Sequence, residues 1–216
     1  MGKWINIHTH RPGKGLNIVD PCLGNLDVQQ GEIVLYSVGV HPMFIDKEVE
    51  MRLEEIRKFA SDGEIVAIGE AGLDRNVYVP MERQMDVFKR QVLLAAEYDL
   101  PLIIHGVRAV SEIVGEAKRI GNSHKWILHG FNNRREVMSE LLRHGMCLSV
   151  GRQVMNEASH AWQLLPEIPR DRLFLETDNS EWGIDEIYNK VAQRLEMREE
   201  ELQDLIQVNY RRLFQR

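Results

Sequence analysis

Cysteine is scarce in this sequence: only Cys22 and Cys147 occur among 216 residues. Two cysteines are too few for a disulfide framework, and they lack the short paired spacing of a thiolate metal site. We therefore expect both thiols to be reduced and buried.

Long hydrophobic runs are also missing. No apolar stretch approaches the roughly 20 residues that span a bilayer, and the start MGKWINIHTH lacks the apolar core of a signal peptide. These absences predict a cytoplasmic protein without a membrane partner. No segment indicates an obligate protein partner or an interdomain linker, so we expect residues 1–216 to form a single domain.

Positive charge is in deficit, since 27 Lys and Arg residues face 33 Asp and Glu residues, for a net charge of -6. A basic global field that would favour tight binding to a polyanion is therefore absent. A nuclease that works through bound metal ions needs only local positive charge, so that class stays open. Hydrophobic residues make up 44% of the chain, which is enough to bury a core.

Short apolar, β-branched segments recur along the chain and alternate with amphipathic helical patterns. Most of these segments are continuously apolar, which is typical of strands covered on both faces. The alternation predicts parallel strands joined by right-handed crossovers, hence an α/β fold and a single (β/α)8 TIM barrel; an open doubly wound sheet is the alternative. Strands are expected at 3–9, 15–20, 33–41, 65–73, 101–106, 125–130, 146–151 and 173–178, and helices at 48–59, from 81 to the turn at 99–101, and at 110–120, 134–144 and 198–214.

The connection between the first two strands is abnormally short. Only RPGKG, residues 11–15, separates them, and the next connection, 21–32, has a loop-like composition. A parallel crossover normally needs about a dozen residues. We expect a barrel that is distorted, or missing a helix, between strands 1 and 2.

Imidazoles and carboxylates gather where the expected strands end. Burying such groups without compensation costs several kcal/mol. Any one of them could be a hydrogen-bonded structural residue or a helix cap, but their joint occurrence at one face of a parallel barrel favours a metal centre. These residues are His8, His10, His41, Glu70, His105, His129, Glu176 and Asp178.

The type of ligand limits the chemistry. Imidazoles and carboxylates without thiolates suit zinc, manganese, iron or, with more oxygen ligands, magnesium. Six ligands exceed the needs of one tetrahedral ion, so two divalent ions that share a carboxylate are plausible, and such pairs activate water for hydrolysis. Asp178, on the last strand, is well placed to accept the proton of that water.

The segments HTH, GVHP, AIGEAGLD, PLIIH, LHGF, LETD and NYRRLF occur in order from residue 8 to residue 214. Together they resemble the successive signatures of the TatD-like metal-dependent deoxyribonucleases, which are TIM barrels of the amidohydrolase superfamily. The resemblance implies magnesium-, manganese- or zinc-dependent hydrolysis of DNA. The expected substrates are single strands or DNA ends, cleaved in the manner of an exonuclease.

The resemblance also implies roles for individual residues. His8 and His10 would bind one divalent ion with Asp178, and Glu70 would bridge to a second ion. His105 and His129 would complete the second site. Asp178 and Glu70 are then the expected catalytic residues.

His41 of GVHP belongs to the family pattern. It is expected either near the substrate or in contact with the metal ligands without binding the metal itself. Glu176 is expected to orient its neighbours.

Several segments depart from the family pattern, although all six expected ligands are kept. Asn6 replaces an acidic residue before the histidine pair, and the arginine after His105 stands one position late, at Arg108. A long loop that usually follows the last strand is absent, and Trp182 there is either a platform for a base or a helix residue packed on the barrel. Candidate phosphate contacts follow strand ends or lie in nearby loops: Arg11, Lys14, Arg75, Arg108, Arg134 and Arg152.

Three functions therefore remain open. The first is a two-metal phosphodiesterase acting on DNA. The second is an amidohydrolase-type enzyme for a small ester, amide or phosphoester, favoured by the trimmed loops and the acidic charge balance. The third is a non-enzymatic protein with a structural metal, which the full ligand set disfavours. The sequence does not distinguish DNA from RNA or one divalent metal from another.

Overall fold

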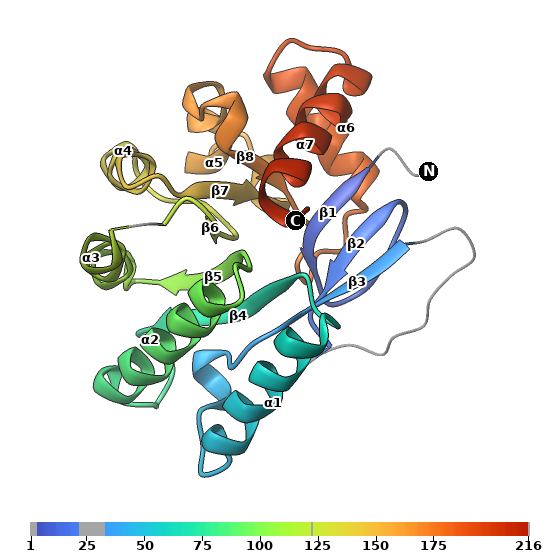
Figure 1. Cartoon of the computed structure of the whole chain (residues 1–216). Coiled ribbons are helices and arrows are strands. Elements are labelled where there is room, and N and C mark those ends of the chain that lie inside the picture. Colours follow the sequence, from blue (N-terminus) through green and yellow to red (C-terminus); the bar gives the residue numbers. More distant parts are fainter. Residues whose placement is uncertain (1–3, 22–32, 122, 216) are drawn as a thin grey trace.

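The computed structural model describes residues 4–21, 33–121 and 123–215. Eight strands lie in one sheet in chain order, and every neighbouring pair is parallel. The sheet curls into a barrel, which a bridge between Thr9 and Asp178 closes (Figure 1). This confirms the predicted TIM barrel over the open sheet. The strands are β1 (Ile5–Thr9), β2 (Leu16–Val19), β3 (Ile33–Val38), β4 (Ala67–Asp74), β5 (Leu102–Val107), β6 (Trp126–Leu128), β7 (Cys147–Val150) and β8 (Leu173–Leu175).

The strands form because their side chains are apolar on both faces. Every residue of β1, β4, β6, β7 and β8 is buried, as expected when one face lines the barrel and the other meets a helix. Strand β1 ends where expected, β4 and β5 each extend one residue further, and β2, β3, β6, β7 and β8 end one to three residues before the expected positions. The last residues of these segments, such as His129 after β6, leave the ladder and enter the loops at the mouth of the barrel.

Helices cover the outer face of the strands from β3 onward (Figure 1). All five expected helices are present, and the first four have ends within a few residues of the expected ones. They form because apolar side chains recur every three or four residues and bury one face, as with Val87, Phe88 and Val92 in α2. The first four are α1 (Val49–Asp62), α2 (Met81–Glu97), α3 (Val110–Ile120) and α4 (Arg135–Arg143).

The C-terminal third adds further helical elements. The expected last helix is α7 (Glu199–Phe214), which packs on β1 and β8 and buries Leu202, Ile206 and Leu213. Further elements, which the sequence pattern did not predict, are α5 (His160–Leu164), α6 (Ile184–Arg194) and the short 3-10 turns η2 (Arg152–Met155), η3 (Leu165–Glu167) and η4 (Arg170–Arg172). A further 3-10 turn, η1 (Pro42–Phe44), follows β3.

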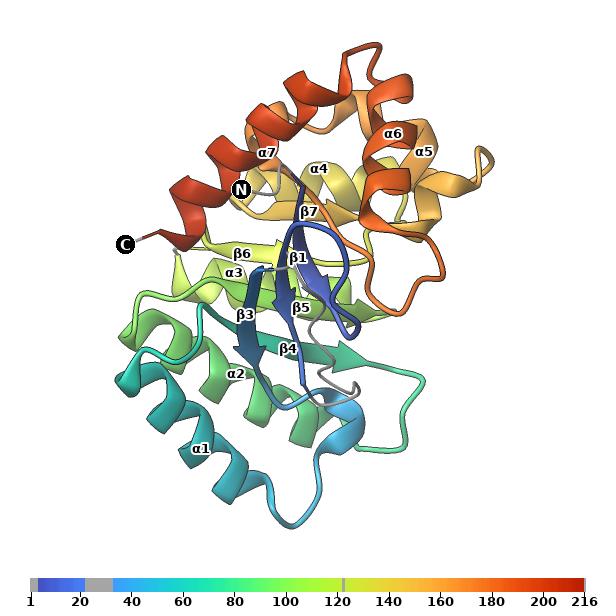
Figure 2. The same cartoon turned by 90° about the vertical axis from the view of Figure 1, so that its right-hand side faces the viewer.

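The barrel has no helix between β1 and β2, as predicted. The chain turns back from Thr9 to Leu16, and Asn17 fastens this turn through bonds to Gly13 and Gly15. The view in Figure 2 faces this side, and β1 and β3 lie there without a helix in front of them. The second short connection, at 21–32, lies almost wholly outside the described residues.

No helix in the described parts of the chain is long and apolar enough to cross a membrane.

Candidate metal centre

The C-terminal ends of the strands bring the six predicted ligands together at one mouth of the barrel. Three overlapping groups place imidazole nitrogens and carboxylate oxygens within 4.8 Å of one another. Glu70, on β4, belongs to two of the groups and lies at their centre. The groups are His8 with His10 and Asp178, His8 with Glu70 and His129, and His41 with Glu70 and His105.

On one side of the centre, the two β1 histidines face two carboxylates. The Nε2 atom of His8 lies 3.4 Å from Glu70 Oε2 and 3.9 Å from Asp178 Oδ1. The Nε2 atom of His10 lies 3.5 Å and 3.6 Å from the same two oxygens. Bonds of about 2.0–2.2 Å to a tetrahedral ion would separate its ligand atoms by about 3.4 Å. The spacing of these four side chains therefore suits one bound cation.

On the other side, two histidines contact the second oxygen of Glu70. His129 Nε2 lies 2.6 Å and His105 Nδ1 lies 3.0 Å from Glu70 Oε1. The two imidazole nitrogens are 3.4 Å apart. Each Glu70 oxygen therefore faces its own pair of histidines, which is the arrangement expected of a carboxylate shared by two ions.

Outer partners orient three of the histidines. His10 Nδ1 lies 3.2 Å from the backbone oxygen of Asp20, and His129 Nδ1 lies 3.3 Å from Glu176 Oε1. A proton on each Nδ1 makes these contacts hydrogen bonds and leaves a lone pair on Nε2, aimed at the centre.

His105 is oriented in the reverse sense. Its Nε2 lies 3.1 Å from Asp74 Oδ2, so a proton on Nε2 leaves the Nδ1 lone pair facing Glu70. In each of these histidines one nitrogen is fixed from outside, and the other is presented to the centre.

Burial and charge shift the pKa values of the central groups. Burial alone would raise the pKa of Glu70, but the positive charge of His129 and His8 holds it well below its usual range. Burial would lower the pKa of His129, but the carboxylates of Glu70 and Glu176 raise it well above its usual range. The centre is therefore built to keep Glu70 ionised and needs positive charge beside it.

His8 gives the clearest sign that the residues fit a metal. Its side chain has no exposed surface, and neither ring nitrogen has a hydrogen-bond partner among the described residues. A buried polar group without a partner costs about 1–3 kcal/mol. A cation held by His8 would satisfy its Nε2, and the set of imidazoles and carboxylates is one that divalent metals prefer.

Sequence reasoning missed two acidic residues that support the centre. Asp20, just after β2, accepts the backbone N–H of Glu70 through Oδ2 and presents its carbonyl to His10. Asp74, the last residue of β4, holds His105. Both end strands of the parallel sheet, so the signal that identified the other residues was also present in NIVD and AGLD.

Asn6, which departs from the family pattern, does not face the metal ligands. Its amide donates to Thr177 Oγ1 and accepts the Thr177 backbone N–H, at 2.8 Å and 3.0 Å. It therefore fixes the residue before Asp178 against β1. Asp178 itself has a left-handed backbone with φ of 52° and donates its N–H to the His8 carbonyl.

The four predicted substrate contacts are placed differently from one another. His41 lies at the centre, with Nε2 4.0 Å from Glu70 Oε1. Arg75 is in an ion pair with Glu112, on α3. Arg108, also with a left-handed backbone, and Arg11 are exposed, and neither guanidinium has a partner among the described residues.

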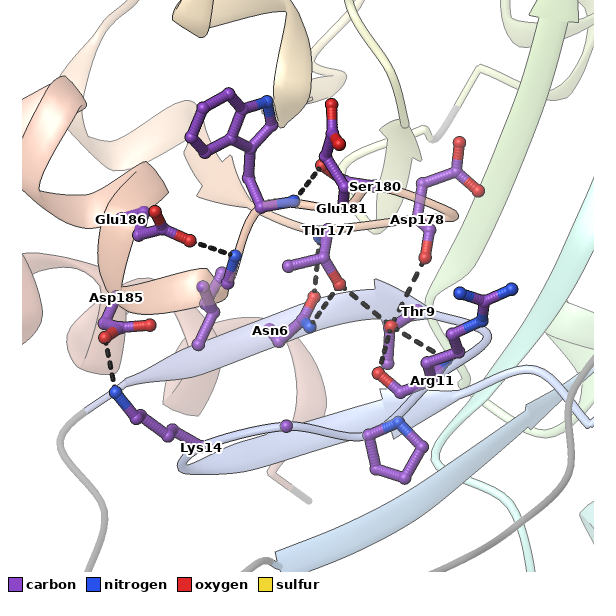
Figure 3. A pocket seen from close by; sticks show the side chains of 15 residues that line it. Asn6, Thr9, Arg11, Lys14, Thr177, Asp178, Ser180, Glu181, Asp185 and Glu186 are labelled. Carbon is purple, nitrogen blue, oxygen red and sulfur yellow. Dashed lines mark hydrogen bonds and ion pairs between the residues drawn. The ribbon is translucent and has the colours of Figure 1, made fainter.

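The prediction of Trp182 as a helix residue packed on the barrel is wrong. Helix α6 begins at Ile184, after its N-cap Gly183, so Trp182 lies in the loop after β8. Its side chain is 38% exposed and lines a pocket beside Asp178. The pocket lies between the turn after β1 and the loop that leads into α6 (Figure 3).

Comparison with known proteins identifies a matching family and several relatives. The family described as TatD related DNase matches residues 24–215. The metal-dependent hydrolase YabD of Bacillus subtilis is 30% identical over 203 residues, which are 87% of this chain and 80% of YabD. The 3'-5' ssDNA/RNA exonuclease TatD of Erwinia tasmaniensis is 33% identical over 66% of this chain, but the match spans only 56% of that relative.

A solved structure supports the fold independently. The crystal structure of YjjV, a TatD homologue from Escherichia coli, superposes with a TM-score of 0.83 over 98% of both chains, at 22% identity. The family match extends over most of the sequence and includes the strands that carry Glu70, His105, His129 and Asp178. The chain therefore belongs to the TatD-related DNase family, and the prediction of a metal-dependent hydrolase is confirmed at the level of that family.

Proposed function

We propose that this chain hydrolyses phosphodiester bonds in single-stranded DNA or at DNA ends, with the help of two divalent metal ions. The observation that carries the proposal is the position of Glu70, whose two carboxylate oxygens each face a separate pair of histidines. The name of the Erwinia relative, a 3'-5' ssDNA/RNA exonuclease, supports this class of substrate.

The residues of the centre divide between two ions. His8, His10 and Asp178 would hold one, and His105 and His129 the other, with Glu70 shared between them. Magnesium, manganese or zinc, when bound, would supply the activation of a water nucleophile and stabilise the leaving oxygen of the phosphodiester. All of these ions suit the mixed nitrogen and oxygen ligands.

Asp178 is the residue that we propose as the proton acceptor. Its side chain is 29% exposed, whereas that of Glu70 is 6% exposed, so water reaches Asp178 more readily. Its backbone bonds to β1 fix the carboxylate beside both β1 histidines. A carboxylate that is positioned and open to water can accept a proton from the attacking water.

His41 is suited to bind the substrate and not a metal. Its Nδ1 accepts the backbone N–H of Met43 at 3.1 Å, so the neutral ring carries its proton on Nε2, the nitrogen that faces the centre. Burial and the nearby His105 lower the pKa of His41 to about 4, which keeps the ring neutral at physiological pH. We propose that Nε2–H donates a hydrogen bond to a phosphate oxygen.

The test is digestion of an end-labelled single-stranded oligonucleotide in the presence of Mg²⁺, Mn²⁺ or Zn²⁺. We expect Asp178→Asn and Glu70→Gln to lose at least about 100-fold in rate. Asp204→Asn is the matched control, because Asp204 is exposed on α7, far along the chain from the ligands. Labels at the 5' and 3' ends report the polarity of digestion.

The outcomes separate the open alternatives. Unchanged digestion by Asp178→Asn or Glu70→Gln, with the metal content unchanged, would contradict the proposed roles. Hydrolysis of small esters or amides at rates well above those on the oligonucleotide would replace the nuclease with an amidohydrolase-type enzyme. Elemental analysis of the purified wild-type protein reports which metal it carries and in what ratio.

A further inference from the structure

A pocket of about 640 Å³ opens beside Asp178, outside the circle of metal ligands. We call it the flank pocket, because its walls are the short turn after β1 and the loop after β8. Its volume lies in the range of small-molecule sites, about 300–1,000 Å³. It is lined by Asn6, Thr9, residues 11–14, Thr177, Asp178 and residues 180–186.

The flank pocket exists because two pieces of the usual barrel are absent from this chain. The turn from Arg11 to Gly15 replaces a helix, and the loop after Asp178 reaches α6 within a few residues. Figure 3 shows the two segments facing each other across the pocket, with Arg11 and Asp178 at one end and Asp185 and Glu186 at the other. The end at Asp178 adjoins the metal centre.

At the end next to the metal centre, the flank pocket has a positively charged side chain, that of Arg11. The backbone N–H and carbonyl of Arg11 both bond to Thr9 Oγ1, at 3.1 Å and 2.8 Å, which fixes the start of its side chain. The Arg11 guanidinium has no partner in the described parts of the chain and lies on the side of the Asp178 carboxylate (Figure 3). An unpaired guanidinium at this place suits a phosphate next to the bond being cleaved.

The remaining charged side chains of the flank pocket are Lys14, Glu181, Asp185 and Glu186, and all but the exposed Glu181 have a partner among the described residues. Lys14 Nζ is 2.6 Å from Asp185 Oδ2, and Glu186 accepts the backbone N–H of Gly183 at 2.7 Å. Trp182 lines this part of the pocket with a 38% exposed side chain, and its backbone N–H is bound by Ser180 Oγ at 3.0 Å. An exposed indole suits stacking of a neutral planar group such as a nucleobase.

We infer that the flank pocket binds a nucleotide of single-stranded DNA next to the one whose phosphodiester is cleaved. Its base stacks on Trp182, and its phosphate pairs with Arg11. This inference rests on the proposed phosphodiesterase function and deepens it, because it assigns a strand-binding subsite to residues outside the metal centre. Double-stranded DNA fits the arrangement poorly, since a paired base would first have to be unpaired and unstacked to reach the indole.

The test measures binding of fluorescein-labelled (dT)10 by anisotropy, with Ca²⁺ replacing the catalytic ions. We expect Trp182→Ala to raise the Kd about 10- to 100-fold, the range for loss of one stacked base. Trp182→Phe keeps an aromatic face and should stay within a few-fold of wild type. Arg11→Gln should weaken binding and flatten its dependence on salt, because one phosphate contact is lost.

Tryptophan fluorescence gives a second readout that does not depend on catalysis. The chain has four tryptophans, and we expect (dT)10 to quench the wild-type emission but not that of Trp182→Phe. Trp162→Phe is the matched control, because Trp162 lies under Lys190 and Arg194 and outside the flank pocket. Its quenching should match that of the wild type.

The results distinguish failure of the inference from failure of the proposed function. If the wild type digests oligonucleotides but Trp182→Ala and Arg11→Gln bind (dT)10 as tightly as it does, the subsite is wrong and the function stands. Absence of (dT)10 binding by the wild type would also overturn the subsite. If the wild type digests no nucleic acid under any metal, the proposed function itself fails.

Discussion

Gln91, on α2, bonds both backbone polar groups of Val40, the residue before His41. Its Oε1 accepts the Val40 N–H at 2.7 Å, and its Nε2 donates to the Val40 carbonyl at 3.1 Å. About two turns earlier on the same helix, Gln84 bonds the N–H and carbonyl of Asp74 in the same way, at 2.8 Å and 2.9 Å. Helix α2 thus fixes the ends of β3 and β4 where they enter the metal centre.

We call the bonds from Gln91 and Gln84 to the two strand ends the clamp, and replacement of Gln91 tests it. Gln91→Leu fills a similar volume but leaves a buried N–H and a buried carbonyl without partners, so we expect a loss of about 2–4 kcal/mol in the free energy of unfolding. Urea denaturation measures it. Gln203→Leu is the matched control, because Gln203 is also buried on a helix but its side chain bonds, among the described residues, only the side chain of Glu199. Equal losses in the two variants would contradict the clamp.

The clamp also marks the limit of what the sequence predicts. Parallel strands place their C-terminal ends at one edge, so the convergence of His8, Glu70, His129 and Asp178 follows from the order of segments alone. A glutamine on a helix carries no comparable signal. Whether Gln91 meets solvent or the end of a strand depends on how α2 rotates against the barrel, which local pattern does not determine.

The loops show the same contrast. The missing helix after β1 was predictable because chain length limits a crossover. The position of Trp182 was not predictable. The start of α6 at Ile184 depends on a cap formed by Gly183 and Glu186, and the loop before it has no hydrophobic periodicity. The side chains that bind substrate lie in such loops, so they are less predictable than the ligands on the strands.

His8→Leu should affect stability differently with and without metal. In a chelator, the variant removes two buried nitrogens that have no hydrogen-bond partner among the described residues, which is favourable, but it also removes a charge that helps to hold Glu70 ionised, so we expect a Tm close to that of the wild type. With excess Mn²⁺ or Zn²⁺ the wild-type Tm should rise, by binding to the native state, and the variant should gain much less. Thermal denaturation in both conditions checks this. An equal metal-dependent rise in the two proteins would remove His8 from the ligands.

We expect the thiol of Cys147 to be unreactive in the native protein. Burial raises its pKa, although Arg212 and Arg172 act in the opposite direction, so the reactive thiolate is scarce at neutral pH. In a Cys22→Ser background, a chromogenic disulfide reagent should react slowly with the folded protein at pH 8 and rapidly in denaturant. Rapid reaction without denaturant would show that β7 is open to solvent at this position.

Two glycines in the turn that replaces the first helix test how that turn is held. Gly15 has φ of 89°, and a Cβ there would meet the Trp4 carbonyl, whereas a Cβ on Gly13 would meet nothing within 4 Å. Left-handed strain alone costs about 1–2 kcal/mol for an L-residue, and the contact adds to it. We expect Gly15→Ala to lower the Tm by about 4 °C or more and Gly13→Ala to leave it unchanged or slightly raised. Differential scanning calorimetry of both variants decides the matter, because equal Tm values would mean that the turn adapts freely and that the wall of the flank pocket is not rigid.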